Sequence, residues 1–271
     1  MIRMAVLGSP ISHSLSPAIH NAAYRFLGVE AEYTSFDVEA AALESFLREK
    51  LISGWRGFSL TMPLKERVLS SLSSVDSSAR KIASANTVVN NDGQWHATST
   101  DLSGFQRLFS PLACERVGVI GGGGTARAAV GALSSKVDQI DVFLRTASRI
   151  DALAAAGGGA LVHARDMSDL TDAEVGSYDL LVSTLPTGAI DEAYADSIEP
   201  AGTLCEVLYH PWPTPLARLW EKNGLMVIDG IDLLVEQALE QISIFTERDF
   251  SWDELRPELL RVARREQRLR M

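Results

Sequence analysis

Cysteine is scarce in this sequence: Cys114 and Cys205 are the only two, and neither lies near the other or near a histidine-rich tract. This usage speaks against a disulfide framework and a zinc site, so we expect no bound metal and a reducing, cytoplasmic location. Long apolar runs are also missing, since no stretch reaches the roughly 20 residues that span a bilayer. The first apolar segment, Met4–Leu7, is short and unlike a secretory signal peptide. We therefore expect no membrane partner.

Positive charge is in deficit, with 25 lysines and arginines against 35 aspartates and glutamates and a net charge of −10. That balance argues against a nucleic-acid partner, and it means that an anionic ligand has to be met by local positive charge. The remaining composition, 46% hydrophobic and 22% charged, is typical of a soluble globular protein. The length suffices for one large domain or two ordinary ones.

The most informative stretch, residues 117–149, begins with the apolar segment Val117–Ile120 and continues with four glycines, an alanine-rich segment and the apolar segment Asp141–Leu144. This order is that of a strand–helix–strand unit with a glycine turn. Glycines let the backbone approach a pyrophosphate, and the helix N-terminus offers unpaired N–H groups. We therefore predict a Rossmann-type nucleotide site. Its cofactor-binding residues in the turn would be Gly121, Gly122, Gly123, Gly124, Thr125 and Ala126.

The end of the second strand in this stretch indicates which dinucleotide is bound. An NAD site usually carries an acidic residue there, which holds the ribose 2′-hydroxyl. This sequence has Arg145 and Thr146 instead, with Arg149 four residues after the first arginine, and guanidinium groups suit a 2′-phosphate. The alternative is that both arginines are solvated charges at a helix start, which the helix dipole disfavours. We predict NADP as the cofactor.

Two alternate hydroxyls precede the first helical segment of the chain. Ser14 and Ser16 stand just before Pro17, and the segment closes at Gly28. One interpretation is structural, with Ser16 as the N-cap and Pro17 in the first turn. The other is that the hydroxyls beside a helix N-terminus form a neutral pocket for a substrate carboxylate. The spacing alone leaves both open.

Further polar residues follow short predicted strands. Thr61 and Lys65 come after the apolar segment 57–60, at a turn that Pro63 enforces. Open α/β sheets bind their ligands at such strand ends. Asn86 is the second residue of a predicted hairpin over residues 85–98. Asp101 starts the next helix, either as its N-cap alone or as a functional carboxylate.

The alternation of strands and helices predicts an α/β protein of two domains. We expect an N-terminal α/β substrate domain, residues 1–102 with 237–271, to which the C-terminal helices return. Residues 103–236 would form a doubly wound, Rossmann-type NADP domain. Its later strands are predicted at 179–183, 203–209 and 226–228, and the long helices near the C-terminus at 233–246 and 253–270. We expect the cleft between the two domains to close over the cofactor.

Taken in order, these motifs resemble the shikimate dehydrogenase family over nearly the whole chain. The motifs that carry the resemblance are Ser14-Leu15-Ser16-Pro17, Thr61-Met62-Pro63-Leu64-Lys65, Ala85-Asn86-Thr87-Val88, Thr100-Asp101-Leu102-Ser103-Gly104, the glycine turn, Arg145-Thr146, Tyr209 and the run from Asp229-Gly230 to Gln237. The resemblance implies reversible, NADP-dependent reduction of 3-dehydroshikimate to shikimate in chorismate and aromatic amino-acid biosynthesis. A monomer or homodimer is expected.

The resemblance also implies roles for individual residues. Ser14, Ser16 and Tyr209 would hold the substrate carboxylate, and Thr61, Asn86 and Gln237 would surround the ring hydroxyls. Lys65 and Asp101 would be the catalytic pair, and Gly230 would lie beside the nicotinamide. The chemistry of the pair follows from its groups, because an ammonium stabilises and protonates the oxyanion that forms when hydride reaches a ketone. No metal is needed for that step.

Several positions depart from the family pattern. Ser59 and Ser99 replace asparagines near the expected ring site, and further departures occur at Gly122, Leu144, Ser183 and Asp232. The two serines leave open a different polyol, such as quinate or an aminated relative of shikimate. A homologue that binds the cofactor for regulation, without efficient turnover, is another alternative. The presence of both Lys65 and Asp101 counts against that one, and Arg145-Thr146 counts against an NAD-linked quinate enzyme.

Overall fold

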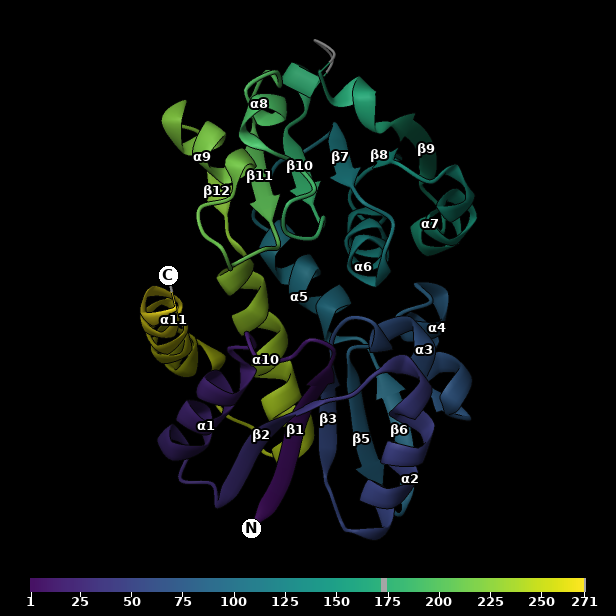
Figure 1. The fold of residues 1–271 in the computed structure, drawn as a ribbon, viewed down its shortest axis with the longest axis vertical. Helices are drawn as coiled ribbons and strands as arrows, with labels where there is room; N and C mark the ends of the chain where they lie inside the picture. Colours follow the sequence, from purple (N-terminus) through teal and green to yellow (C-terminus); the bar gives the residue numbers. More distant parts are fainter. Residues whose placement is uncertain (172–174, 271) are drawn as a thin grey trace. The chain divides into compact units, whose positions relative to one another are not determined.

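The computed structural model describes residues 1–171 and 175–270, which form two compact units. Unit 1 comprises residues 1–104 and 234–270, and unit 2 comprises residues 105–233. Helices α5 (Thr100–Phe109) and α10 (Gly230–Thr246) carry the chain from one unit to the other (Figure 1). Each unit contains a six-stranded sheet.

The sheet of unit 1 is mixed. Its strands, in spatial order, are β2 (Ala31–Asp37), β1 (Ile2–Gly8), β3 (Gly57–Leu60), β5 (Thr87–Asn91), β6 (Gln94–Thr98) and β4 (Ser74–Val75). β1 runs parallel to both β2 and β3, whereas β5 is antiparallel to β3 and to β6. All four residues of β3 are buried, as its apolar sequence predicts for a central strand. The hairpin turns at Asp92 and Gly93, both at positive φ.

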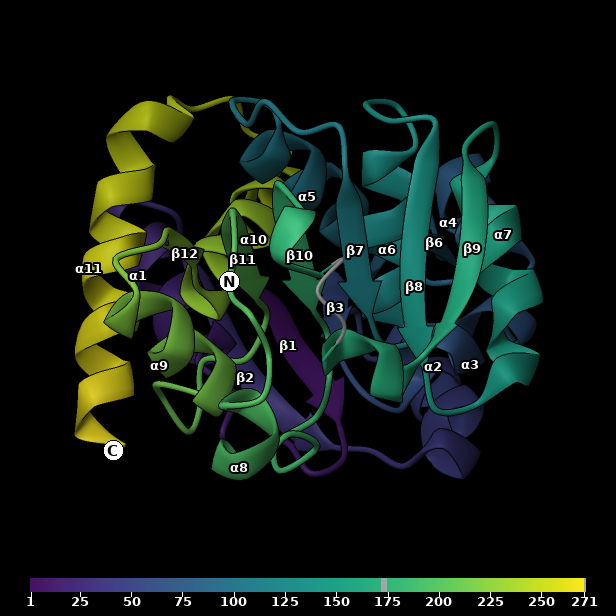
Figure 2. The same ribbon diagram turned by 90° about the horizontal axis from the view of Figure 1, so that it is seen from above.

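Helices from both ends of the chain surround this sheet. Those that belong wholly or partly to unit 1 are α1 (Ser16–Phe26), α2 (Leu43–Ile52), α3 (Leu64–Ser71), α4 (Ser77–Lys81), the start of α5, most of α10 and α11 (Trp252–Leu269). α1 and α11 pack side by side (Figures 1 and 2). α10 packs against β3 through Phe245, so closely that a Cβ at Gly57 would lie 2.4 Å from its ring. This confirms that the C-terminal helices return to the first part of the chain.

The sheet of unit 2 is entirely parallel. Its strands, in spatial order, are β12 (Val227–Ile228), β11 (Thr203–Glu206), β10 (Leu180–Ser183), β7 (Val117–Ile120), β8 (Gln139–Leu144) and β9 (Leu161–Asp166). In chain order within the unit this is 6-5-4-1-2-3, the order of the Rossmann fold. The helices α6 (Gly124–Leu133), α7 (Ile150–Gly157), α8 (Glu192–Ala195) and α9 (Pro215–Lys222) connect these strands. The prediction of a doubly wound sheet is confirmed.

Three local expectations were wrong. Ser16 is not an N-cap but the first residue of α1, and the hydroxyl of Ser14 accepts its N–H at 3.3 Å. β11 ends at Glu206 rather than Tyr209, because the N–H of Leu208 bonds to the Glu206 side chain. α10 begins three residues before the expected Leu233, since the side chain of Asp229 accepts the N–H groups of Ile231 and Asp232.

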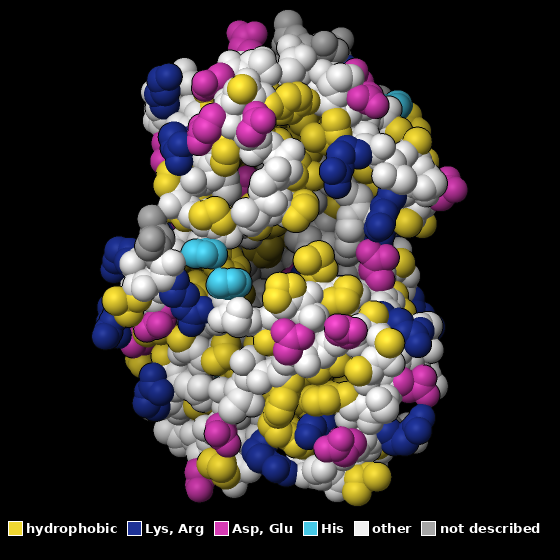
Figure 3. Space-filling view, in the orientation of Figure 1, with side chains coloured by type: hydrophobic (Ala, Val, Ile, Leu, Met, Phe, Trp, Pro, Cys, Tyr) yellow, Lys and Arg dark blue, Asp and Glu magenta, His cyan; other side chains and the backbone are white. Residues whose placement is uncertain are grey.

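The surface carries charges of both signs (Figure 3), and the cysteines form no disulfide. Basic and acidic side chains are interspersed on the face drawn in Figure 3. Both cysteines are free thiols, with Cys205 buried in β11 and Cys114 partly exposed. Within residues 1–171 and 175–270, no helix combines the length and the apolar character needed to cross a membrane.

Candidate active site

Lys65 and Asp101 form a close ion pair in unit 1. Lys65 lies in the first turn of α3, and Asp101 lies in the first turn of α5. The Lys65 Nζ donates to Asp101 Oδ2 at 2.6 Å, and the two side chains are 18% and 7% exposed. Asp101 is thus one residue inside its helix, and its carboxylate bonds to other side chains, which argues against a role as an N-cap alone.

Asn86 connects this pair to the backbone of unit 1. Its amide oxygen accepts the Thr100 N–H at 2.7 Å, and its Nδ2 donates to Asp101 Oδ1 at 2.8 Å. The two oxygens of Asp101 are therefore divided between Asn86 and Lys65. Nδ2 also lies 3.3 Å from Gln237 Oε1 on α10, and the Gln237 amide donates to the Leu234 carbonyl. Asn86 is only 2% exposed and Gln237 6%.

Thr61 lies against the end of β1, and the two predicted carboxylate-binding serines follow that strand in the chain, before and at the start of α1. The Thr61 N–H donates to the Leu7 carbonyl at 2.9 Å, which holds the turn after β3 against β1. The next residue of β1 has to be glycine, because a Cβ at Gly8 would lie 2.3 Å from Thr61 Cγ2. Ser14 is partly exposed and Ser16 is buried. Unit 1 thus places Ser14, Ser16, Thr61 and Lys65 at or just beyond the carboxyl ends of β1 and β3.

The glycine turn of unit 2 has the geometry that a pyrophosphate needs. Gly121 has φ +115, and a Cβ there would lie 2.4 Å from Thr184 Oγ1. Gly123 is the N-cap residue of α6, and a Cβ at this position would meet open space. Gly124, Thr125 and Ala126 form the first turn of α6, where backbone N–H groups lack helical partners. These residues fit a dinucleotide phosphate by the shape of the turn.

The predicted 2′-phosphate residues lie next to this turn. Arg145, Thr146 and Arg149 are exposed and follow the end of β8, which pairs in parallel with β7. The Arg149 side chain packs where a Cβ of Gly122 would meet it at 3.1 Å, and its guanidinium lies 3.5 Å from the Gly122 carbonyl. Arg127 of α6, which the sequence analysis did not identify, lies equally far from the same carbonyl and is only 3% exposed. Two guanidinium groups therefore lie close to one carbonyl of the turn.

Tyr209 and Gly230 lie in unit 2, on the segments that follow β11 and β12. Tyr209 belongs to the loop 207–214, so the predicted carboxylate ligands are divided between the two units. A Cβ at Gly230 would lie 2.2 Å from the Val207 carbonyl oxygen, so only glycine lets the start of α10 approach this loop.

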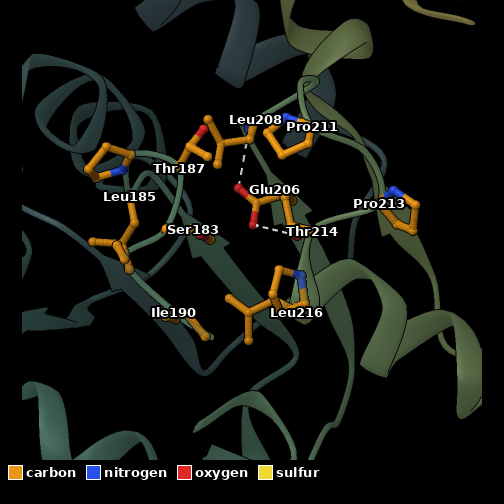
Figure 4. Close-up of a pocket in the computed structure, with 14 residues that line it drawn as sticks. Ser183, Leu185, Thr187, Ile190, Glu206, Leu208, Pro211, Pro213, Thr214 and Leu216 are labelled. Atoms are coloured by element: carbon orange, nitrogen blue, oxygen red, sulfur yellow. Dashed lines mark hydrogen bonds between the residues drawn. The ribbon is translucent and has the colours of Figure 1, made fainter. Parts of the chain in front are cut away.

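A buried carboxyl group that the sequence analysis did not identify anchors that loop (Figure 4). Glu206 ends β11 and is 2% exposed, beside a pocket of about 60 Å³. Its Oε1 accepts the Leu208 N–H at 3.2 Å, and its Oε2 accepts the Thr214 hydroxyl at 3.1 Å. Thr214 in turn caps α9 through the Ala217 N–H. Burial raises the pKa of Glu206 to about 7. An acidic residue in the apolar segment 204–208 was the only sequence signal.

The departures from the family pattern have different surroundings. Ser59 is 5% exposed, and its hydroxyl forms hydrogen bonds with the side chains of Tyr33 and Gln241. Ser99 is as buried, and its hydroxyl has no hydrogen-bond partner among the residues that the structure describes. Over the same residues, no group of three or more histidine, cysteine or acidic side chains is arranged to hold a metal ion.

The sequence and the fold are both similar to those of known proteins. Residues 6–88 match the model of the shikimate dehydrogenase substrate binding domain. The NADP(+) shikimate dehydrogenase of Shouchella clausii is 30% identical over 257 residues, which cover 91% of this chain and 93% of the relative. The crystal structure of Mycobacterium tuberculosis shikimate dehydrogenase has a TM-score of 0.85 and 34% identity, covering 96% and 99% of the two chains.

Two ligand complexes have the same fold. Shikimate 5-dehydrogenase from Thermus thermophilus, solved with NADP(H) and shikimate, has a TM-score of 0.84 and 30% identity, covering 98% of this chain and 100% of that one. Quinate dehydrogenase from Corynebacterium glutamicum, solved with NAD, has a TM-score of 0.82 and 25% identity, with coverage of 96% and 99%.

A Rossmann-type unit joined to a mixed α/β unit with a partly buried lysine–aspartate pair is typical of a class, the two-domain oxidoreductases. Within that class, identity of 30% over nine-tenths of the chain identifies the family. The chain belongs to the shikimate dehydrogenase family.

The raised pKa of Glu206 predicts a pH-dependent stability. Its folded-state pKa of about 7 exceeds the ordinary value of 4.5, so its stabilising contribution is complete below pH 4.5 and is lost as pH rises through 7. Glu206→Gln removes this titration. We expect the variant to gain about 2–3 kcal/mol in unfolding free energy relative to the native chain between pH 5 and pH 8. Urea unfolding at both pH values measures the difference.

The matched control is Glu221→Gln, which changes an exposed glutamate of the same unit. All other titrating groups are shared, so their contributions cancel in the comparison. A Glu206→Gln difference that stays constant across this pH range would contradict the prediction.

Proposed function

We propose that this protein catalyses the reversible, NADP-dependent reduction of 3-dehydroshikimate to shikimate. Unit 1 would bind the substrate and unit 2 the cofactor. The observation that carries the proposal is the Lys65–Asp101 pair, closed at 2.6 Å and held by Asn86, in a member of this family. A purely regulatory binder of the cofactor has no need of such a pair.

Lys65 supplies the acid–base chemistry in this proposal. When bound, NADPH provides the hydride that is added to the carbonyl carbon. The Lys65 ammonium stabilises the negative charge that develops on the carbonyl oxygen and then donates a proton to it, which yields the hydroxyl group. In the oxidation, a neutral Lys65 accepts the hydroxyl proton. Asp101 orients the amine, because its other oxygen is already engaged by Asn86.

The remaining residues would orient the substrate and the cofactor. Ser14, Ser16 and Tyr209 would bind the carboxylate through neutral hydroxyls. Asn86 and Gln237, with Thr61, would bind the ring hydroxyls. In unit 2, the turn 121–126 would hold the pyrophosphate, with Gly230 beside the nicotinamide. Arg145, Thr146 and Arg149 would bind the 2′-phosphate.

Oxidation of quinate with NAD is the second candidate, and the similarity to the Corynebacterium glutamicum enzyme supports it. Arginine and threonine at the end of β8, where an NAD site has an acidic residue, favour the first candidate.

Initial rates with shikimate and quinate, each measured with NADP and with NAD, test the proposal. We expect turnover to be fastest with shikimate and NADP, since the arginines after β8 suit the phosphorylated cofactor. Faster turnover of quinate with NAD would replace the proposal by the second candidate. No turnover with either polyol, together with tight NADP binding, would indicate a regulatory protein or a different substrate.

Lys65→Ala removes the acid–base group. We expect turnover to fall by about 10²–10⁴-fold, the usual contribution of a positioned acid or base. NADP binding, measured by calorimetry, should change little, because Lys65 lies outside the cofactor unit. Lys81→Ala is the control, since Lys81 is an exposed lysine of the same unit. Equal losses in the two variants would exclude a catalytic role for Lys65.

Arg145→Asp places a negative charge where the 2′-phosphate would bind. We expect NADP affinity to fall by about 1–3 kcal/mol, the value of a charged hydrogen bond, and NAD affinity to change far less. Lys222→Asp makes the same change of charge at an exposed position on α9. Titration of both cofactors with both variants is the measurement. Equal losses of NAD and NADP in Arg145→Asp would refute the 2′-phosphate assignment.

A further inference from the structure

A buried chain of polar side chains lies behind the Lys65–Asp101 pair. It consists of Tyr33, Ser59, Gln241, Thr87 and Asn86, and we call it the relay. Its members come from β2, β3, α10, β5 and the residue before β5, so segments far apart in the sequence meet in it. Gln241 stands at its centre with no exposed surface, one helical turn after Gln237.

Gln241 joins the two ends of the relay. Its Oε1 accepts the Ser59 hydroxyl at 2.7 Å. Its Nε2 donates to the Asn86 carbonyl at 3.2 Å and to Thr87 Oγ1 at 2.8 Å. Both amide protons and the carbonyl oxygen are therefore used. The peptide carbonyl of Asn86 can only accept, so the orientation of the Gln241 amide is determined.

The directions of the neighbouring bonds can be assigned from the available protons in the same way. Ser59 has a single hydroxyl proton and gives it to Gln241, so Tyr33 is the donor in the 2.5 Å contact between their hydroxyls. Thr87 accepts from Gln241, and its own proton goes to Asn86 Oδ1 at 3.0 Å. The same oxygen accepts the Thr100 N–H, so the Asn86 amide presents its NH₂ group to Asp101.

The end of the relay at Tyr33 is shielded from solvent and carries no charge. Tyr33 is 1% exposed, and burial raises the pKa of its hydroxyl. The ring of Tyr33 stacks on His20 with 4.0 Å between centroids, and its backbone bonds twice to the side chain of Asn21. Burial lowers the pKa of His20 to about 3, so no charge enters the relay from this side near neutral pH.

We infer that Gln241 is a positioning residue of the active site: with Ser59 and Tyr33 behind it, it fixes Asn86 and thereby the Asp101 carboxylate that orients Lys65. The assignment of Lys65 as the acid–base group rests on the proposed function. The inference gives Ser59 a supporting role, in place of the ring contact that its position in the sequence suggested.

Gln241→Met tests the inference, because methionine keeps the volume and removes all three hydrogen bonds. We expect kcat to fall by about 10–100-fold while the KM for NADP changes less than about twofold, since the cofactor residues lie in unit 2. Gln267→Met is the matched control, a buried glutamine of α11 in the same unit. Tyr33→Phe, which keeps the stacked ring and removes only the terminal donor, should lower kcat by about two- to fivefold.

A second readout does not depend on turnover. The chain has five lysines, so reductive ¹³C-methylation yields a simple spectrum in which Lys65→Arg assigns the Lys65 signal. We expect the chemical shift of that signal to change in Gln241→Met and Tyr33→Phe and to remain unchanged in Gln267→Met. A shifted signal in an enzyme that oxidises neither polyol would support the relay and overturn the proposed function.

The inference is overturned if Gln241→Met keeps kcat within about twofold of the native chain, per folded molecule, and leaves the Lys65 signal in place. Thermal unfolding of each variant gives the folded fraction. A purely supportive role for Gln241 would lower the unfolding temperature without moving either readout. If Gln241→Met does not fold, Tyr33→Phe and Ser59→Ala are judged by the same two measurements.

Discussion

The orientation of one buried amide, that of Asn86, is the constraint on which unit 1 depends. Its oxygen is fixed by the backbone N–H of Thr100, and its nitrogen therefore faces Asp101. A reversed amide would place two oxygens against each other and two donors against each other, at a position that is only 2% exposed. The strand β5, the helix α5 and the helix α10 each contribute a partner to this amide. The packing of β5, α5 and α10 around Asn86 thus fixes the position of the Asp101 carboxylate on α5.

In unit 2 the main constraint is the negative charge that a dinucleotide would bring to an acidic chain. The chain carries a net charge of −10, yet a dinucleotide cofactor brings further negative charge. The fold meets it locally, with the N-terminus of α6 and the guanidinium groups of Arg127 and Arg149 near one carbonyl of the glycine turn. The buried Arg127 has no freedom to follow a ligand, whereas the exposed Arg145 does. The arginines near the glycine turn therefore differ in exposure, with Arg127 held inside unit 2 and Arg145 and Arg149 at its surface.

Local patterns predicted much of this protein, and long-range contacts limited the rest. Strand β3, the glycine turn and the hairpin at Asp92-Gly93 follow from apolar runs and turn residues a few positions apart. The pairing of Lys65 with Asp101 came from the family resemblance, because nothing local connects them. Gln241 had no signal, since its partners are about 150 to 180 positions away. Glu206 was missed because an acidic residue in a short apolar segment is equally typical of an exposed strand end and of a buried carboxyl group.

The two serines that replace family asparagines illustrate why a substitution near a site is not always a change of specificity. Ser59 has given its only proton to Gln241 and accepts from Tyr33, so its bonds serve the protein interior. An asparagine there would bring two amide protons and a larger side chain to a position that is 5% exposed. Ser99 differs, because its buried hydroxyl lacks a partner among the described residues, and such a group is costly unless something else satisfies it.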